Sequence, residues 1–77
     1  MRVKLHGVRR ISINSGYIKL DALLKHAALV STGGEAKALI QGGHVFVDGE
    51  ICVQRGRKIT HGSVVKLNGE TLIVELG

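Results

Sequence analysis

The chain has 77 residues, 44% of them hydrophobic, which is enough for one small domain over residues 1–77 and excludes a wholly disordered chain. Its net charge of +5 favours a polyanionic partner, and residues 1–37 carry the whole excess, with seven Lys or Arg against two acidic residues. One cysteine excludes an internal disulfide, and no apolar run is long enough for a signal peptide or a membrane span, so we expect a cytoplasmic protein.

The first part of the sequence predicts a strand and then a helix. Residues 9–13 alternate between polar and apolar side chains, as a short strand does, and Asn14-Ser15-Gly16 ends this alternation. Between residues 18 and 28, apolar side chains recur at positions i, i+3, i+4 and i+7, which predicts an amphipathic helix. The side chains on its expected buried face are Leu20, Leu23, Leu24 and Ala27.

A second helix is predicted after a break at residues 30–34. The same apolar spacing continues from Gly34 to Gln41, and the glycine that follows is a typical helix stop. Thr32 and Glu35 have the spacing of a capping box, in which the two residues satisfy each other's backbone N–H groups at the start of a helix. The sequence therefore predicts two short helices in succession.

The rest of the sequence predicts short strands joined by tight turns. Asp48-Gly49 and Asn68-Gly69 are strong hairpin signals, and residues 54–58 form a basic loop between the two hairpins. The expected strands are residues 45–47, 51–53, 64–67 and 72–76. The predicted fold class is α+β, with two short packed helices followed by a small, mostly antiparallel sheet.

Three segments resemble a known family when they are taken in order. They are Lys19-Leu20-Asp21-Ala22-Leu23-Leu24, Ser31 with Ala36-Lys37-Ala38-Leu39-Ile40, and Gly43-His44-Val45-Phe46-Val47-Asp48-Gly49. Together they are similar to the RNA-binding domain named after small-subunit ribosomal protein four, also called the αL motif. Gly33-Gly34-Glu35 and Arg55-Gly56-Arg57-Lys58 resemble free-standing bacterial members. The resemblance implies an αL-type fold that binds ribosomal RNA and acts in ribosome assembly or ribosome-associated quality control.

Candidate RNA contacts come from basic side chains and from one turn. Three cations between Arg55 and Lys58 suit closely spaced phosphates, although they could also form a solvated loop. Backbone N–H groups near Thr32 suit a phosphate or are capped by their own side chains. Lys37 and Gln41 share an exposed helix face. The predicted RNA-binding residues are Lys19, Lys25, Ser31, Thr32, Gly33, Gly34, Lys37, Gln41, His44, Arg55, Arg57 and Lys58, and we expect the cations to gather into one patch.

Other classes of function have less support in the sequence. The four histidines and Cys52 match no compact metal-ligand spacing, and no paired carboxylates or phosphate loop are present, so we expect no metal, no cofactor and no enzymatic activity. We expect a monomer with no small-molecule substrate and no membrane partner. The alternative is a protein-interaction module, either a scaffold for a ribosomal factor or a ubiquitin-like protein. A sulfur carrier of that type needs a diglycine tail, whereas this sequence ends Leu76-Gly77.

Overall fold

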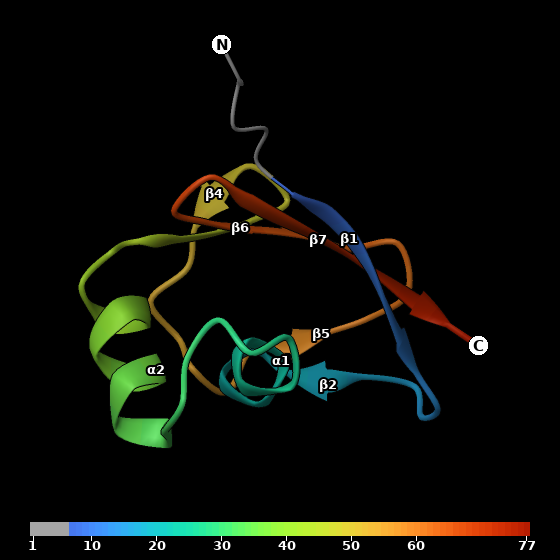
Figure 1. Cartoon of the computed structure of the whole chain (residues 1–77), viewed down its shortest axis with the longest axis horizontal. Helices are drawn as coiled ribbons and strands as arrows, with labels where there is room; N and C mark the ends of the chain where they lie inside the picture. The colour runs from blue at the N-terminus through green and yellow to red at the C-terminus, as the bar shows by residue number, and fades with distance from the viewer. Residues whose placement is uncertain (1–6) are drawn as a thin grey trace, which may run out of the picture.

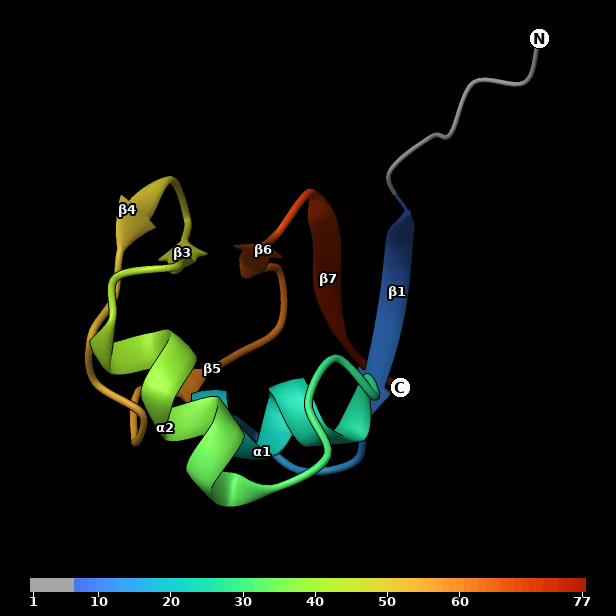
Figure 2. The same ribbon diagram turned by 60° about the vertical axis from the view of Figure 1, so that its left-hand side comes forward.

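Two helices and a two-stranded ribbon lie on the same side of a five-stranded sheet (Figures 1 and 2). The structure is a computed structural model that describes residues 7–77. In chain order the elements are β1 (Val8–Ile13), β2 (Ile18–Lys19), α1 (Leu20–His26), α2 (Gly33–Gln41), β3 (Val45–Val47), β4 (Glu50–Ile51), β5 (Lys58–Ile59), β6 (Val64–Leu67) and β7 (Glu70–Leu76).

The five-stranded sheet has the order β1-β7-β6-β3-β4, and only its β1–β7 pair is parallel. Two-residue turns close the β3–β4 and β6–β7 hairpins. In both turns the two central residues have positive φ, with 51° and 89° at Asp48 and Gly49 and 51° and 83° at Asn68 and Gly69. Asp-Gly and Asn-Gly tolerate that conformation, and its twist matches that of the flanking strands. The predicted fold class and both hairpins are therefore confirmed.

The core lies between the helices and the inner face of the sheet. Leu20, Leu23 and Leu24 of α1 are fully buried, as are Ala36 and Ile40 of α2. The strands supply alternate residues to this core, as a sheet with one covered face does. The strand residues between them point to the opposite face of the sheet, which we call the outer face. They include Phe46, Ile51, Lys66 and Arg10, all of which are exposed.

The predicted first helix is too long at both ends. Ile18–Lys19 forms β2, which pairs antiparallel with β5, so α1 begins only at Leu20. At the other end α1 stops at His26, and Ala28 has a φ of 61°, a left-handed conformation that cannot continue a right-handed helix. The residues between 18 and 28 therefore belong to a strand, a helix and a turn.

The expected strand over residues 51–53 is also shifted. Only Glu50–Ile51 pairs with β3, and the N–H of Cys52 donates a last hydrogen bond to the Val45 carbonyl at 2.9 Å. The chain then leaves the sheet and runs to β5, which takes Lys58 from the predicted basic loop. This connection, residues 52–57, passes close to the start of α1 and positions the candidate site.

Candidate nucleic-acid interface

Backbone hydrogen bonds bring two distant basic segments together at the start of α1. The β2–β5 pairing places Lys19 directly opposite Lys58. The N–H of Leu20 donates to the Arg57 carbonyl at 2.9 Å, and the N–H of Asp21 donates to the Arg55 carbonyl at 3.1 Å. Because the first N–H groups of a helix have no partner within it, and Lys19 gives no side-chain cap, the basic loop itself caps α1. We call Lys19, Arg55, Arg57 and Lys58 the basic cluster.

The basic cluster has no acidic partner among the described residues. All four side chains are exposed, and the one ion pair within residues 7–77 joins Arg10 to Glu75 at 3.1 Å on the outer sheet face. Asp21 is the nearest acid along the chain, and its carboxylate accepts from the N–H of Ala22 at 2.7 Å. Like charges directly opposite each other in an antiparallel pair are unfavourable, so Lys19 and Lys58 repel each other.

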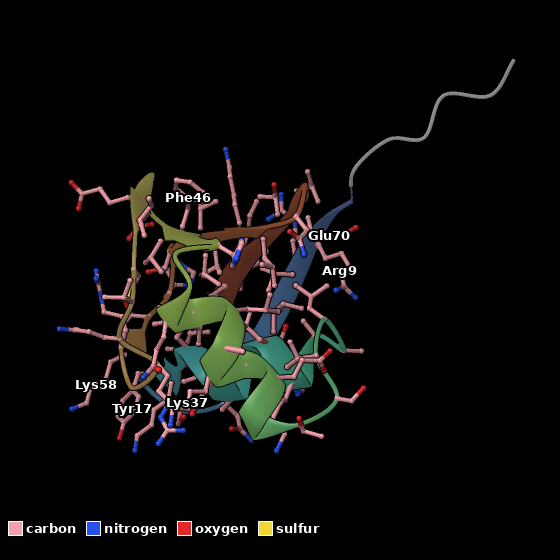
Figure 3. The ribbon with its side chains drawn as sticks, turned by 90° about the vertical axis from the view of Figure 1, so that its left-hand side faces the viewer. Arg9, Tyr17, Lys37, Phe46, Lys58 and Glu70 are labelled. Atoms are coloured by element: carbon pink, nitrogen blue, oxygen red, sulfur yellow. The ribbon has the colours of Figure 1, made fainter. Side chains whose placement is uncertain are left out.

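Helix α2 lies beside the loop that carries the two arginines. Figures 1 and 2 both show the connection between β4 and β5 running along α2. Lys37 and Gln41 are exposed on this helix, whereas Ala36 and Ile40 face the core. In Figure 3, Lys37 and Lys58 point outward on the same side of the molecule. The second helix can therefore extend the charged surface of the basic cluster.

The turn at the start of α2 already holds a carboxylate. The Thr32 hydroxyl accepts from the N–H of Glu35 at 3.1 Å, which is the predicted cap. The Glu35 carboxylate accepts from the N–H of Ser31 at 2.6 Å, so the reciprocal bond closes on Ser31 rather than on Thr32. Gly33 and Gly34 are exposed, and a phosphate approaching them would meet the negative charge of Glu35.

Two predicted residues lie away from the basic cluster. Lys25 is in the last turn of α1, about 8 Å along the helix axis from Leu20 at 1.5 Å per residue. His44 lines a hollow of about 490 Å³ together with Phe46 and Lys66 of the outer sheet face.

The cations of the first strand face other partners. Arg9 donates to the Ala27 carbonyl at 2.7 Å, and Arg10 pairs with Glu75. Arg2 and Lys4, which contribute to the basic excess of the N-terminal half, lie outside the described residues.

Sequence reasoning missed Tyr17, which stands next to the basic cluster. The chain has one tyrosine and one phenylalanine, and both side chains are exposed, Tyr17 at 42% and Phe46 at 39%. The Lys58 ammonium lies 4.8 Å from the centre of the Tyr17 ring. No local signal marked it, because its position next to Lys58 depends on the pairing of β2 with β5.

The described part of the chain holds neither a clustered set of metal ligands nor a membrane-spanning helix. Within residues 7–77, no three His, Cys, Asp or Glu side chains come together as a metal site would require. Cys52 is buried, with its Sγ 3.7 Å from the Gln54 carbonyl oxygen. Among the same residues, neither helix has the length and apolar character needed to span a bilayer.

The family follows from a match over most of the chain. Residues 11–75 match the family model for the S4 domain. The chain belongs to the S4 domain family. This S4 domain is 39% identical, over 59 residues, to the probable ribosome maturation protein RlbA of Bacillus subtilis, a match that covers 77% of this chain and 83% of the relative.

A solved structure gives the same family and fold. The solution structure of YbcJ from E. coli, described as revealing an αL motif involved in RNA binding, matches with a TM-score of 0.71 and 28% sequence identity. The match covers 97% of this chain and 96% of YbcJ. The predicted family and the αL-type fold of this S4 domain are therefore confirmed.

Proposed function

We propose that this S4 domain binds structured ribosomal RNA through the basic cluster and acts in ribosome assembly or ribosome-associated quality control. The observation that carries the proposal is the set of four exposed cations, without an acidic partner among residues 7–77, that the β2–β5 pairing and the hydrogen bonds capping α1 hold together. The described RNA-binding motif of YbcJ and the ribosome-maturation role in the name of RlbA support it.

Phosphate binding follows from the chemistry of the basic cluster. A phosphate between Lys19 and Lys58 would replace their repulsion with two attractions. Arg55 and Arg57 present planar guanidinium groups that can bind phosphate through two parallel hydrogen bonds, whereas the lysines act as point charges. Phosphate contacts fix position and carry little sequence information, so the RNA would be recognised mainly by its shape.

The remaining predicted contacts fit a longer RNA. Lys37 and Gln41 would continue the site along α2, where the arginine-bearing loop lies beside that helix. Contacts at Lys25, at His44 and at the turn of residues 31–34 would need RNA that extends beyond the basic cluster. The proposed role needs no catalysis by this chain, and it would be carried out in the cytoplasm by a monomer.

A salt titration tests this proposal with a structured ribosomal RNA fragment, identified first by crosslinking in cells. Each phosphate contact releases counterions and contributes about 0.7 to 0.9 to the slope of log affinity against log salt, so four contacts predict a slope of roughly −3. Affinity should then fall roughly 60-fold between 50 and 200 mM salt. The measurement is fluorescence anisotropy of the labelled RNA.

The same titration separates the alternative of a protein-interaction module. Such a module would leave little ribosomal RNA among the crosslinked species, and any residual RNA affinity would vary only weakly with salt. A slope close to zero would contradict the proposal. A steep slope with equal affinity for an unrelated hairpin of the same length would contradict the choice of ribosomal RNA.

A further inference from the structure

Tyr17 shares one face of the β2–β5 ribbon with the two lysines of the basic cluster. Tyr17 directly precedes β2, and Tyr17 and Lys19 are exposed, whereas Ile18 between them packs against the core. Ile18 pairs with Ile59, which is fully buried, whereas Lys19 pairs with exposed Lys58. The ribbon therefore anchors its inner face in the core and presents Tyr17 with two ammonium groups on its outer face.

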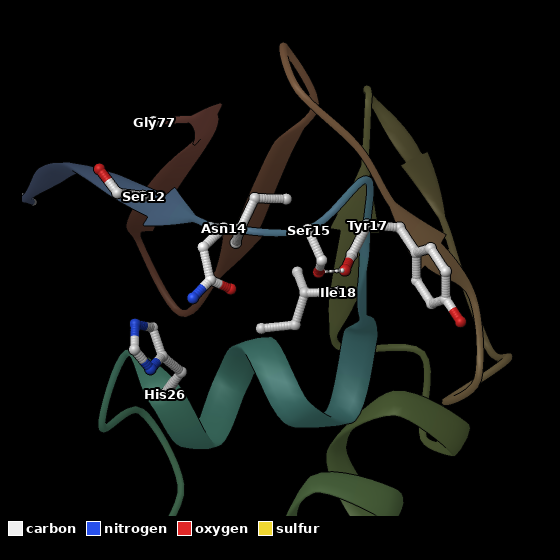
Figure 4. A pocket seen from close by; sticks show the side chains of 8 residues that line it. Ser12, Asn14, Ser15, Tyr17, Ile18, His26 and Gly77 are labelled. Carbon is white, nitrogen blue, oxygen red and sulfur yellow. Dashed lines mark hydrogen bonds between the residues drawn. The ribbon is translucent and has the colours of Figure 1, made fainter.

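The Tyr17 ring is exposed and is not part of the core. The Ser15 hydroxyl donates to the Tyr17 carbonyl at 2.9 Å, which fixes the turn before β2. Tyr17 lies at the edge of a hollow of about 440 Å³ that Asn14 and His26 also line, and Figure 4 shows its ring on the side away from those two residues. The exposed ring instead lies under the Lys58 ammonium, with 4.8 Å between the nitrogen and the ring centre (Figure 3).

We propose that Tyr17 is a stacking platform for an unpaired RNA base, and that Lys58 leaves the ring to bind the phosphate beside that base. This inference rests on the proposed function, because it places RNA at the basic cluster. An uninterrupted RNA duplex has no free base face, so the preferred substrate is a paired stem interrupted by a bulge or an internal loop. The site then reads two features of RNA at once, a phosphate backbone and a flipped-out base.

The strengths of the two ring contacts favour this exchange. An exposed cation–π contact such as that of Lys58 contributes about two- to fivefold to an equilibrium. Stacking of a base on an aromatic ring contributes roughly 5- to 150-fold in affinity per base. The base therefore displaces the ammonium with a net gain, and the released lysine acquires a phosphate partner of opposite charge.

Phe46 provides a matched control within the same chain. It is exposed to nearly the same extent as Tyr17, at 39% against 42%, and it also has a lysine neighbour, Lys66, directly opposite on β6. It lies on the outer sheet face, on the far side of the sheet from the helices and the ribbon (Figure 3). If the loss of any exposed aromatic side chain weakened RNA binding, Tyr17→Ala and Phe46→Ala would weaken it alike. If Tyr17 is a specific stacking platform, only Tyr17→Ala should weaken it.

The experiment compares two blunt RNA duplexes that differ by one bulged nucleotide, bound to wild-type, Tyr17→Ala, Tyr17→Phe and Phe46→Ala proteins. Wild type should prefer the bulged duplex. Tyr17→Ala should lose about tenfold in affinity for the bulged duplex and less than twofold for the perfect one. Tyr17→Phe and Phe46→Ala should keep the wild-type preference, because the first retains the ring and the second leaves the site unchanged.

Intrinsic fluorescence gives a second readout that reports only on this residue, because the chain has one tyrosine and no tryptophan. The bulged duplex should quench Tyr17 emission more strongly than the perfect duplex does. If Tyr17→Ala changes neither affinity, or changes both equally, while Arg55→Ala weakens both, this inference is wrong and the proposed function stands. If wild type binds neither duplex in a salt-dependent manner, the proposed function and this inference both fail.

Discussion

Replacing Arg55 and Arg57 together with alanine is expected to weaken RNA binding about 100-fold at moderate salt and to leave the fold intact. A hydrogen bond to a charged group contributes about 1.5 kcal/mol or more, and two such losses amount to about 3 kcal/mol, or roughly two powers of ten. The fold should survive because these residues cap α1 with their backbone carbonyls, while both side chains are exposed. Anisotropy gives the affinity, and circular dichroism gives the stability.

The matched control removes the same charge from the opposite side of the molecule. Arg10→Ala with Lys66→Ala also deletes two exposed cations, and both lie on the outer sheet face. A purely nonspecific attraction between a basic protein and RNA would weaken equally in both double variants. We expect less than a fivefold loss in the control, since neither Arg10 nor Lys66 belongs to the proposed RNA site. Equal losses in the two double variants would contradict an RNA site at the basic cluster.

Ile59→Ala is expected to lower the free energy of unfolding by about 3 kcal/mol, within the range of about 2 to 5 kcal/mol for such a core truncation. Ile59 is fully buried and is the only β5 residue that reaches the core beneath the basic cluster. A 77-residue domain has a total stability of roughly 4 to 12 kcal/mol, so the loss is a large part of it. The midpoint of thermal unfolding should fall by roughly 12 to 24 °C.

Two isoleucine variants serve as controls for that measurement. Ile51→Ala makes the same chemical change at a side chain that is 59% exposed, and it should alter stability by less than about 0.5 kcal/mol. Ile59→Val removes one methylene from the core and should cost about 1 kcal/mol. If Ile59→Ala were as mild as Ile51→Ala in urea unfolding, the β2–β5 ribbon could not be the rigid support of the basic cluster.

The parts of the fold that were predictable depend on local chemistry. Asp48-Gly49 and Asn68-Gly69 determine their own turns, and the Thr32 cap with the apolar stripe that follows determines α2. The β2–β5 ribbon had no such signal, because each strand has only two residues and its partner is some 40 residues away. Ile18 was assigned to α1 because an apolar residue next to a helix fits the helical pattern as well as it fits a strand. The pairing of Ile18 with Ile59 places it in a strand.

The candidate site was also predictable only in part. The charge density of Arg55, Arg57 and Lys58 was visible in the sequence, but their position beside Lys19 depends on backbone carbonyls that cap α1. Side-chain patterns carry no information on such bonds. Tyr17 was missed for the same reason, since its position next to Lys58 follows from the ribbon. Thr32 and Glu35 have the spacing of a capping box, but the Glu35 carboxylate accepts from the N–H of Ser31 and not from that of Thr32.

Mapping amide chemical-shift changes on the ¹⁵N-labelled protein tests the location of the RNA site most directly. On addition of a bulged RNA duplex, we expect the largest changes at residues 17–20 and 55–58, with smaller ones along the exposed face of α2. The outer sheet face, at Phe46, Lys66 and Ile73, should change little. The largest changes at those three residues, with residues 55–58 unaffected, would show that RNA binds the open sheet and not the basic cluster.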